Sequence, residues 1–266
     1  MIRDITLGQY YPADSVLHRL DSRVKLISTL VFLVSMFLVK NISGFLIATI
    51  FLGGVIICSK IPFKFIVKGL KAIIVLLLFS VIFTLFFEKG EPLIQFWIIK
   101  ITKQGLQKAG FTVGRMTYLI CGSSLMTLTT TPNDLTDGLE RLLNPLKKIK
   151  VPVHEIAMMM SVALRFIPIL LEETDKIMKA QIARGADFEE KGLLKKAKSL
   201  VPLLVPLFIS AFRRADDLGL AMEARCYQGG EGRTKMKPLV FKSMDYISFL
   251  VVLSYFVILL LINQYL

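Results

Sequence analysis

Cysteine and histidine are scarce in this chain, which has three cysteines and two histidines among 266 residues. Cys58, Cys121 and Cys226 lie far apart and form no paired spacing, so we expect neither a disulfide framework nor a zinc site. His18 has no candidate metal ligands near it, and we expect a structural hydrogen bond there instead. The composition therefore argues against redox and metal chemistry.

A secretory signal is also missing from the first 25 residues, which have no short apolar stretch followed by a small-residue cleavage site. We therefore expect a retained amino terminus. Apolar residues nevertheless make up 54% of the chain, and several apolar runs have the length that the hydrocarbon core of a bilayer demands. The sequence predicts an all-α integral membrane protein.

The formal net charge of +13 raises the possibility of a nucleic-acid partner. No basic run is interleaved with stacking aromatic residues, however, as single-strand binding surfaces require. The Lys and Arg residues instead lie beside apolar runs, where positive charge marks the cytoplasmic side of a membrane protein. We therefore expect a lipid bilayer and no nucleic acid as partner.

About five transmembrane helices are predicted. Four of them form a membrane domain at residues 26–131, and their expected ranges are about 26–40, 42–59, 70–87 and 108–130. The last covers residues 245–266. Basic residues precede the first helix and follow the second, so both flanks favour the cytoplasm and the pair crosses twice. This topology places residues 1–25 in the cytoplasm and the carboxyl terminus outside.

Residues 132–244 are predicted to form a cytoplasmic domain of amphipathic helices at about 132–146, 154–184 and 193–225. Thr131-Pro132-Asn133-Asp134 resembles a capping box and starts the first of them. Two apolar stretches, 156–171 and 200–212, are poor membrane spans. The first contains Arg165 and Pro168, and an arginine at mid-bilayer costs about 3 kcal/mol on insertion scales.

Two of these helices end in similar tripeptides, Ala183-Arg184-Gly185 and Ala224-Arg225-Cys226. A cation at the carboxyl end of a helix complements the macrodipole, which is a sufficient account of either arginine alone. Two such tips favour a second interpretation. Small neighbours leave each guanidinium accessible, and its planar fork suits a carboxylate in a partner's groove.

Several separated motifs, in this order, resemble the transmembrane T component of energy-coupling factor transporters, which import vitamins and metals in prokaryotes. They are the segment from Ser15 to Lys25, the segment from Leu128 to Thr136, Leu164-Arg165-Phe166-Ile167-Pro168 and the two arginine tripeptides. In that family the second tripeptide often ends in glycine. Cys226 departs from this pattern, and we expect little effect on docking, although the local turn can differ.

The resemblance implies a non-catalytic subunit in the prokaryotic plasma membrane. Its arginine tips would dock into two ATP-binding-cassette (ABC) ATPases, which bind ATP and Mg²⁺, and would transmit their closure to a substrate-binding S component. The chain itself would bind no cofactor. Met158, Met159 and Met160 form a candidate contact surface for S components because methionine repacks easily, although simple helix packing is the more common reason for such a run.

Two other functions were considered. An intramembrane enzyme needs paired acids, a nucleophile with its base, or metal ligands within the spans, and the predicted spans lack them. A self-sufficient secondary carrier or channel needs buried ionisable residues along a substrate path, of which the predicted spans contain almost none. The sequence does not identify the imported solute, whether several S components share the chain, or which arginine enters which ATPase.

Overall fold

The computed structural model describes residues 10–39, 41–71, 73–87, 92–96, 99–186, 188, 192–230, 236 and 238–265. They divide into two compact units. The first contains the described residues of 8–138 and 239–266, and the second contains those of 139–238. The chain passes from the first unit to the second within helix α7 and returns after Pro238.

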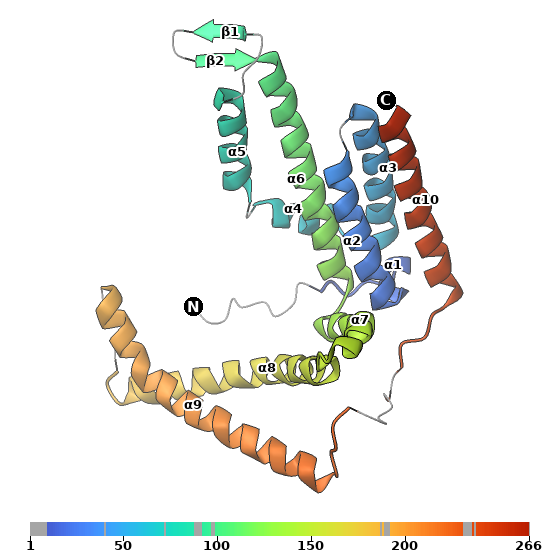
Figure 1. Ribbon diagram of the computed structural model, residues 1–266. Coiled ribbons are helices and arrows are strands. Elements are labelled where there is room, and N and C mark those ends of the chain that lie inside the picture. The colour runs from blue at the N-terminus through green and yellow to red at the C-terminus, as the bar shows by residue number, and fades with distance from the viewer. Residues whose placement is uncertain are drawn as a thin grey trace. The chain divides into compact units, whose positions relative to one another are not determined.

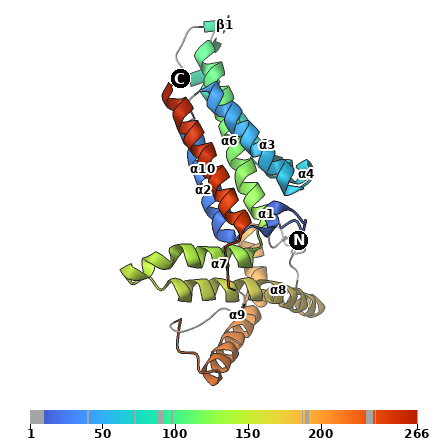
Figure 2. The same cartoon turned by 90° about the vertical axis from the view of Figure 1, so that its right-hand side faces the viewer.

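The first unit is mainly helical. Its elements are α1 (Val16–Arg19), α2 (Ser22–Leu38), α3 (Ile42–Ser59), α4 (Phe63–Lys71), α5 (Ile74–Phe87), β1 (Pro92–Phe96), β2 (Ile99–Thr102), α6 (Lys103–Thr129), the start of α7 (Pro132–Leu143) and α10 (Ser243–Tyr265). Helices α2, α3, α6 and α10 lie side by side in both views (Figures 1 and 2). The predominantly helical class predicted from the sequence is confirmed, and the antiparallel hairpin of β1 and β2 is an addition to it.

The core of this unit lies where α2, α3, α6 and α10 meet. The Tyr255 ring of α10 stacks on the Phe51 ring of α3 with 4.2 Å between ring centroids, and its hydroxyl lies 2.8 Å from Ser35 Oγ of α2. A Cβ atom added to Gly122 of α6 would come within 2.7 Å of the Phe32 ring of α2. The missing side chain at Gly122 therefore lets α6 approach α2 closely, as small residues do between membrane helices.

A buried carboxylate joins the beginnings of the first and last long helices. Asp245, which is 2% exposed, accepts hydrogen bonds from the backbone N–H of Asp21 at 2.8 Å and of Lys242 at 2.7 Å. Asp21 in turn accepts from the backbone N–H of Arg23 and forms an ion pair with its guanidinium at 2.8 Å. The start of α10 is thus tied to the start of α2.

The third expected helix differs from the observed structure. One helix was expected at about 70–87, whereas the chain forms α4 and α5, whose axes are bent by 60° relative to one another. The division follows the composition, because α4 contains three lysines and α5 contains none. Helix α6 also begins five residues before the expected position 108, since Thr102 caps it by accepting the N–H of Gly105 at 3.0 Å.

The second unit consists of the end of α7, the 3₁₀ helix η2 (Asn144–Ile149), α8 (Val153–Ala183) and α9 (Leu193–Ala224). Pro145 ends the α-helical geometry before residue 146, where the sequence-based helix was expected to end. The expected start of α7, similar to a capping box, is present: Asp134 N–H donates to Thr131 Oγ1 at 3.2 Å, and Thr131 Oγ1 donates to Asp134 Oδ2 at 2.7 Å.

Three helices among the described residues are long and apolar enough to cross a membrane: α3, α8 and the segment Ser243–Gln264 of α10. The bent pair α4 and α5 forms a fourth candidate if it is counted as one span. Helices α2 and α6, which were expected to cross, do not meet this measure of length and composition, whereas α8, which was expected in the cytoplasm, does.

We predict that Asp245→Ala destabilises the first unit by about 2–4 kcal/mol, because the buried N–H of Asp21 and the partly buried N–H of Lys242 lose a charged acceptor. Asp245→Asn should have a smaller effect, since its amide oxygen still accepts one of these bonds. Thermal unfolding of the purified chain in mild detergent measures the difference. Asp217→Ala, at an exposed position of α9, is the control, and an equal loss there would contradict the assigned role of Asp245.

Candidate functional site

Helices α8 and α9 pack against each other and cross (Figure 1). One side chain of α8, Glu173, links the two helices where they cross. It accepts a hydrogen bond from Ser210 Oγ and forms an ion pair with Arg214, whose Nη2 lies 2.7 Å from Glu173 Oε2. Ser210 and Arg214 are one turn apart on α9, so a single carboxylate binds two successive turns. This Glu173 clasp sets where along their lengths the two helices meet.

Both helices end in the same backbone geometry. Arg184 has φ −89° and ψ 5°, and Arg225 has φ −93° and ψ 13°. The next residue is left-handed in each case, with φ +87° at Gly185 and φ +56° at Cys226. The turn at Cys226 therefore has the same backbone form as the turn at Gly185.

The hydrogen bonds that close the two turns are also equivalent. Gly185 N–H donates to Ile182 O at 2.9 Å and Ala186 N–H to Gln181 O at 3.0 Å. At the second tip, Cys226 N–H donates to Glu223 O at 2.9 Å and Tyr227 N–H to Met222 O at 3.1 Å. This pair of bonds defines a Schellman motif. Both helices thus present an arginine at the last position before a left-handed stop.

The six residues of the two tripeptides are all exposed, namely Ala183, Arg184, Gly185, Ala224, Arg225 and Cys226. In the part of the chain that the structure describes, neither arginine guanidinium has a carboxylate partner. Both tips therefore offer an unpaired cation and the planar donor fork that binds a carboxylate in two places.

The first half of α9 has an exposed apolar face. The sequence predicted an amphipathic helix here but did not name the residues of this face. Leu203 is buried, but its neighbours along the helix are exposed, and they are Val201, Leu204, Val205, Phe208, Ile209 and Phe212. Their spacing of three and four residues was the available signal. On α8, Met159 and Met160 are exposed, whereas Met158 is half-buried.

The chain leaving the second tip passes against the first turn of α8. Gly230 lies so close to His154 that an added Cβ would come within 2.6 Å of the ring's Cγ atom. The ring is held in turn by Glu140 of α7, whose Oε1 lies 2.8 Å from His154 Nδ1. Only glycine fits this contact without a shift of backbone or ring. The segment after Arg225 is thereby held at the junction of α7 and α8.

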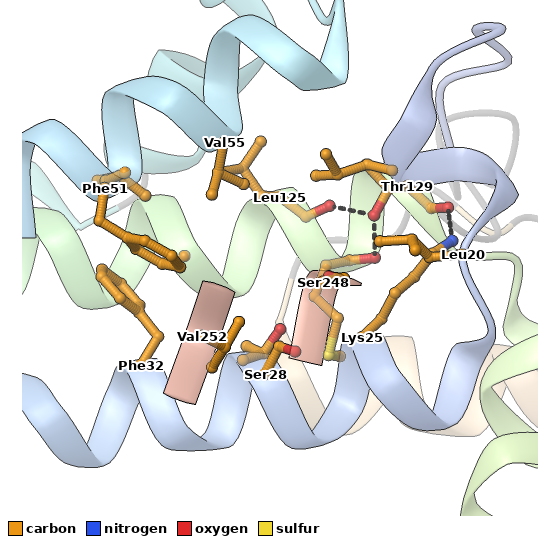
Figure 3. A pocket seen from close by; sticks show the side chains of 15 residues that line it. Leu20, Lys25, Ser28, Phe32, Phe51, Val55, Leu125, Thr129, Ser248 and Val252 are labelled. Atoms are coloured by element: carbon orange, nitrogen blue, oxygen red, sulfur yellow. Dashed lines mark hydrogen bonds between the residues drawn. The ribbon is translucent and has the colours of Figure 1, made fainter. Parts of the chain in front are cut away.

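A pocket in the first unit lies among α2, α3, α6 and α10 (Figure 3). Phe32, Phe51 and Val252 line its apolar part, and Lys25 and Thr129 lie at its polar end. Lys25 precedes the apolar run of α2 and donates to the backbone carbonyls of Thr129 at 2.9 Å and His18 at 3.3 Å. Burial lowers the pKa of Lys25 to about 8, although Asp134, Asp21 and Asp245 oppose the shift.

This polar end connects two of the sequence motifs, because Lys25 belongs to the segment that starts at Ser15 and Thr129 to the segment that starts at Leu128. His18 makes the structural hydrogen bonds that were expected, to Ser15 Oγ at 2.7 Å and to Tyr11 O at 2.9 Å. No group of three potential metal ligands occurs among the described residues. Through its hydrogen bond to Thr129, Lys25 joins the start of α2 to the end of α6.

We predict that Cys226→Gly makes the second tip more stable by about 1 kcal/mol, because a left-handed conformation is unfavourable for a residue with a Cβ atom. Hydrogen–deuterium exchange at the amides of residues 222–227 should slow accordingly. Cys226→Ala keeps the Cβ atom and serves as the control. Equal slowing in both variants would show that loss of the thiol, and not the backbone conformation, is responsible.

We further predict that Gly230→Ala destabilises the second unit by about 1–3 kcal/mol, the usual effect of overpacking. The double variant Gly230→Ala with His154→Ala should recover part of that loss, because the colliding ring is gone. Unfolding midpoints of the four members of this cycle measure the interaction. Gly219→Ala is the control, since nothing lies within 4 Å of a Cβ at that position. Strict additivity of the two changes would contradict the contact.

Comparison with known proteins identifies the family of this chain. The family model of the cobalt transport protein CbiQ matches residues 13–236. The energy-coupling factor transporter transmembrane protein EcfT of Clostridium kluyveri is 53% identical over 250 residues, which cover 93% of each chain. The EcfT of Bacillus subtilis is 50% identical over 246 residues, which cover 92% of this chain and 93% of its own. These relatives are named as transmembrane components of a transporter and not as catalytic subunits. The chain therefore belongs to the family of transmembrane T components of energy-coupling factor transporters.

Proposed function

We propose that this chain couples two ABC-type ATPases to a substrate-binding S component, so that ATP hydrolysis in the partners drives uptake of a vitamin or another micronutrient. The observation that supports this best is the equivalence of the two helix tips. Two arginines with the same backbone geometry and the same hydrogen-bonded stop, neither paired with a carboxylate among the described residues, suit two similar sockets. Two ABC-type ATPase subunits with similar grooves would supply them.

The crossing of α8 and α9 gives these tips a mechanical role. Helix α8 has 31 residues and α9 has 32, so each is about 45–50 Å long. Because the Glu173 clasp joins the two helices at their crossing, a displacement of one tip would also displace the other helix. Closure of two ATPases would thereby move both helices together.

The membrane topology in this proposal has five crossings, formed by α2, α3, α5, α6 and α10. The amino terminus and the coupling domain 132–244 face the cytoplasm of a prokaryotic cell. Helix α8 has the length and composition of a span, but we keep it in the cytoplasm because Arg165 is exposed near its middle and Pro168 follows. Placing Arg165 at mid-bilayer would cost about 3 kcal/mol.

The S component would bind the apolar surface of the coupling helices. Met159 and Met160 of α8 and the face of α9 from Val201 to Phe212 are exposed and apolar, as the central part of a protein interface requires. Met158 belongs to the same run, although its side chain is half-buried. Methionine side chains adapt to different partners, which suits exchange among several S components.

ATP and Mg²⁺ are assigned to the partner ATPases, and no cofactor is assigned to this chain. Its contribution is then to transmit motion and not to perform chemistry. The identity of the solute resides in the S component, so the proposal extends only to the class of micronutrients.

We predict that Arg184→Glu or Arg225→Glu weakens assembly with the ATPases by about ten-fold or more, because a carboxylate at the tip repels a carboxylate-lined socket. Arg184→Ala or Arg225→Ala should weaken this assembly less, because alanine removes the cation without adding a repelling charge. The measurement is recovery of the ATPases with the tagged chain from membranes in mild detergent, together with uptake in reconstituted vesicles. Arg213→Glu, an equal charge change at an exposed position away from the tip of α9, is the control.

Unchanged recovery and uptake in both tip variants would reject the docking role. Purification of the unaltered chain tests the wider proposal, since mass spectrometry should find two ABC-type ATPases and one or more small membrane proteins. Transport by the purified chain alone would instead establish the alternative, a self-sufficient carrier, and would reduce both arginines to helix caps.

A further inference from the structure

Acidic residues are absent from a long part of the chain, since no Asp or Glu occurs between Asp21 and Glu88. Helix α4 lies within this stretch and contains Lys64, Lys68 and Lys71. Among the described residues, neither Lys64 nor Lys71 forms an ion pair or a hydrogen bond through its ammonium group, and both side chains are exposed. Their positive charge is not neutralised within the described structure.

The three lysines occupy one side of α4. At about 100° per residue, their positions fall within about 60° of one another and nearly opposite Ile66. Ile66 is fully buried, and Gly69 lies against Ser124 of α6, so that side of α4 faces the helices of its own unit. Lys64 and Lys71, which are exposed, lie on the side of α4 that faces away from them. We call these two residues the lysine stripe.

Exposed apolar side chains lie on both sides of this stripe. Phe63 is 64% exposed, and Phe65 and Val67 are also exposed. A helix with a packed face, apolar flanks and a basic stripe has the composition of helices that lie in the plane of a membrane interface. Burial in the hydrocarbon core is excluded, because each lysine at the centre of a span costs about 3 kcal/mol.

The position of α4 in the chain also places it at a membrane surface. Helix α3, a candidate span, ends at Ser59, and the apolar helix α5 begins at Ile74. The 60° bend between α4 and α5 coincides with the change from a lysine-containing helix to one without charge. A helix that lies on the surface and then turns into the bilayer produces this combination.

We propose that α4 is an interfacial helix whose lysine stripe binds the phosphates of anionic phospholipids, while Phe63, Phe65 and Val67 enter the region of the acyl chains. Free phosphate would leave these apolar flanks in water, whereas a phospholipid satisfies both parts of the surface. The helix would then anchor this side of the first unit to the anionic leaflet. The proposal requires that α3 and α5 lie in a bilayer, but it does not depend on docking by the arginine tips.

The test uses the full chain alone, without ATPases, and a fluorophore on Cys58, an exposed residue at the end of α3. Cys226 is replaced by serine so that only Cys58 is labelled at the surface. Quenching by brominated phosphatidylglycerol and by brominated phosphatidylcholine, in reconstituted vesicles, gives the relative affinity of the two lipids next to α4. Phosphatidylglycerol should be preferred, and the preference should fall as ionic strength rises.

The variant Lys64→Gln with Lys71→Gln should lose this preference by about five-fold for each lysine replaced. Lys64→Arg with Lys71→Arg should keep it, because the charge is retained. Lys147→Gln with Lys148→Gln, at exposed positions of η2, changes the net charge equally and should leave the preference unchanged. Equal affinity for the two lipids at low salt, or an equal loss in the η2 variant, would overturn the proposal.

Discussion

The left-handed residue after each arginine is the constraint on which the candidate site depends. A helix must satisfy its last carbonyl groups, and a residue with positive φ lets the following N–H groups turn back to them. Gly185 does this without a Cβ atom, and Cys226 adopts the same conformation with one. Because the stop comes immediately after Arg184 and Arg225, each arginine stands at the extreme end of its helix, clear of the turn that closes it.

The proposed coupling role requires that the point where α8 and α9 cross be fixed. The Glu173 clasp defines it with a carboxylate that binds two turns of α9 through Ser210 and Arg214. A second contact, between Gly230 and His154, holds the chain that leaves the second tip against the first turn of α8. The second tip is therefore held both by its own helix and by the segment that follows it, within one compact unit.

Charge organises the first unit in a different way. Two of its acids, Asp21 and Asp245, are buried at the point where the starts of α2 and α10 are linked, and no acid occurs from residue 22 to residue 87. Lys25 is half-buried and donates to backbone carbonyls, whereas Lys64 and Lys71 stay exposed on α4. Lysine thus links two helices where backbone carbonyls can replace water as hydrogen-bond acceptors, and it remains a surface charge where they cannot.

Local features were readable from the sequence by itself: the helical class, the capping box at Thr131 and Asp134, the stop at Gly185 and the exposed arginine tips. Each depends on residues within about one turn of each other. The separation of α4 from α5 and the hairpin before α6 were missed, since apolar length alone does not fix where a helix bends. Only the tertiary structure decided which face of α9 stays open, that Glu173 meets Arg214, and that Gly230 meets His154. These contacts join residues far apart in the chain, and their pairing depends on how whole helices pack, which no local spacing encodes.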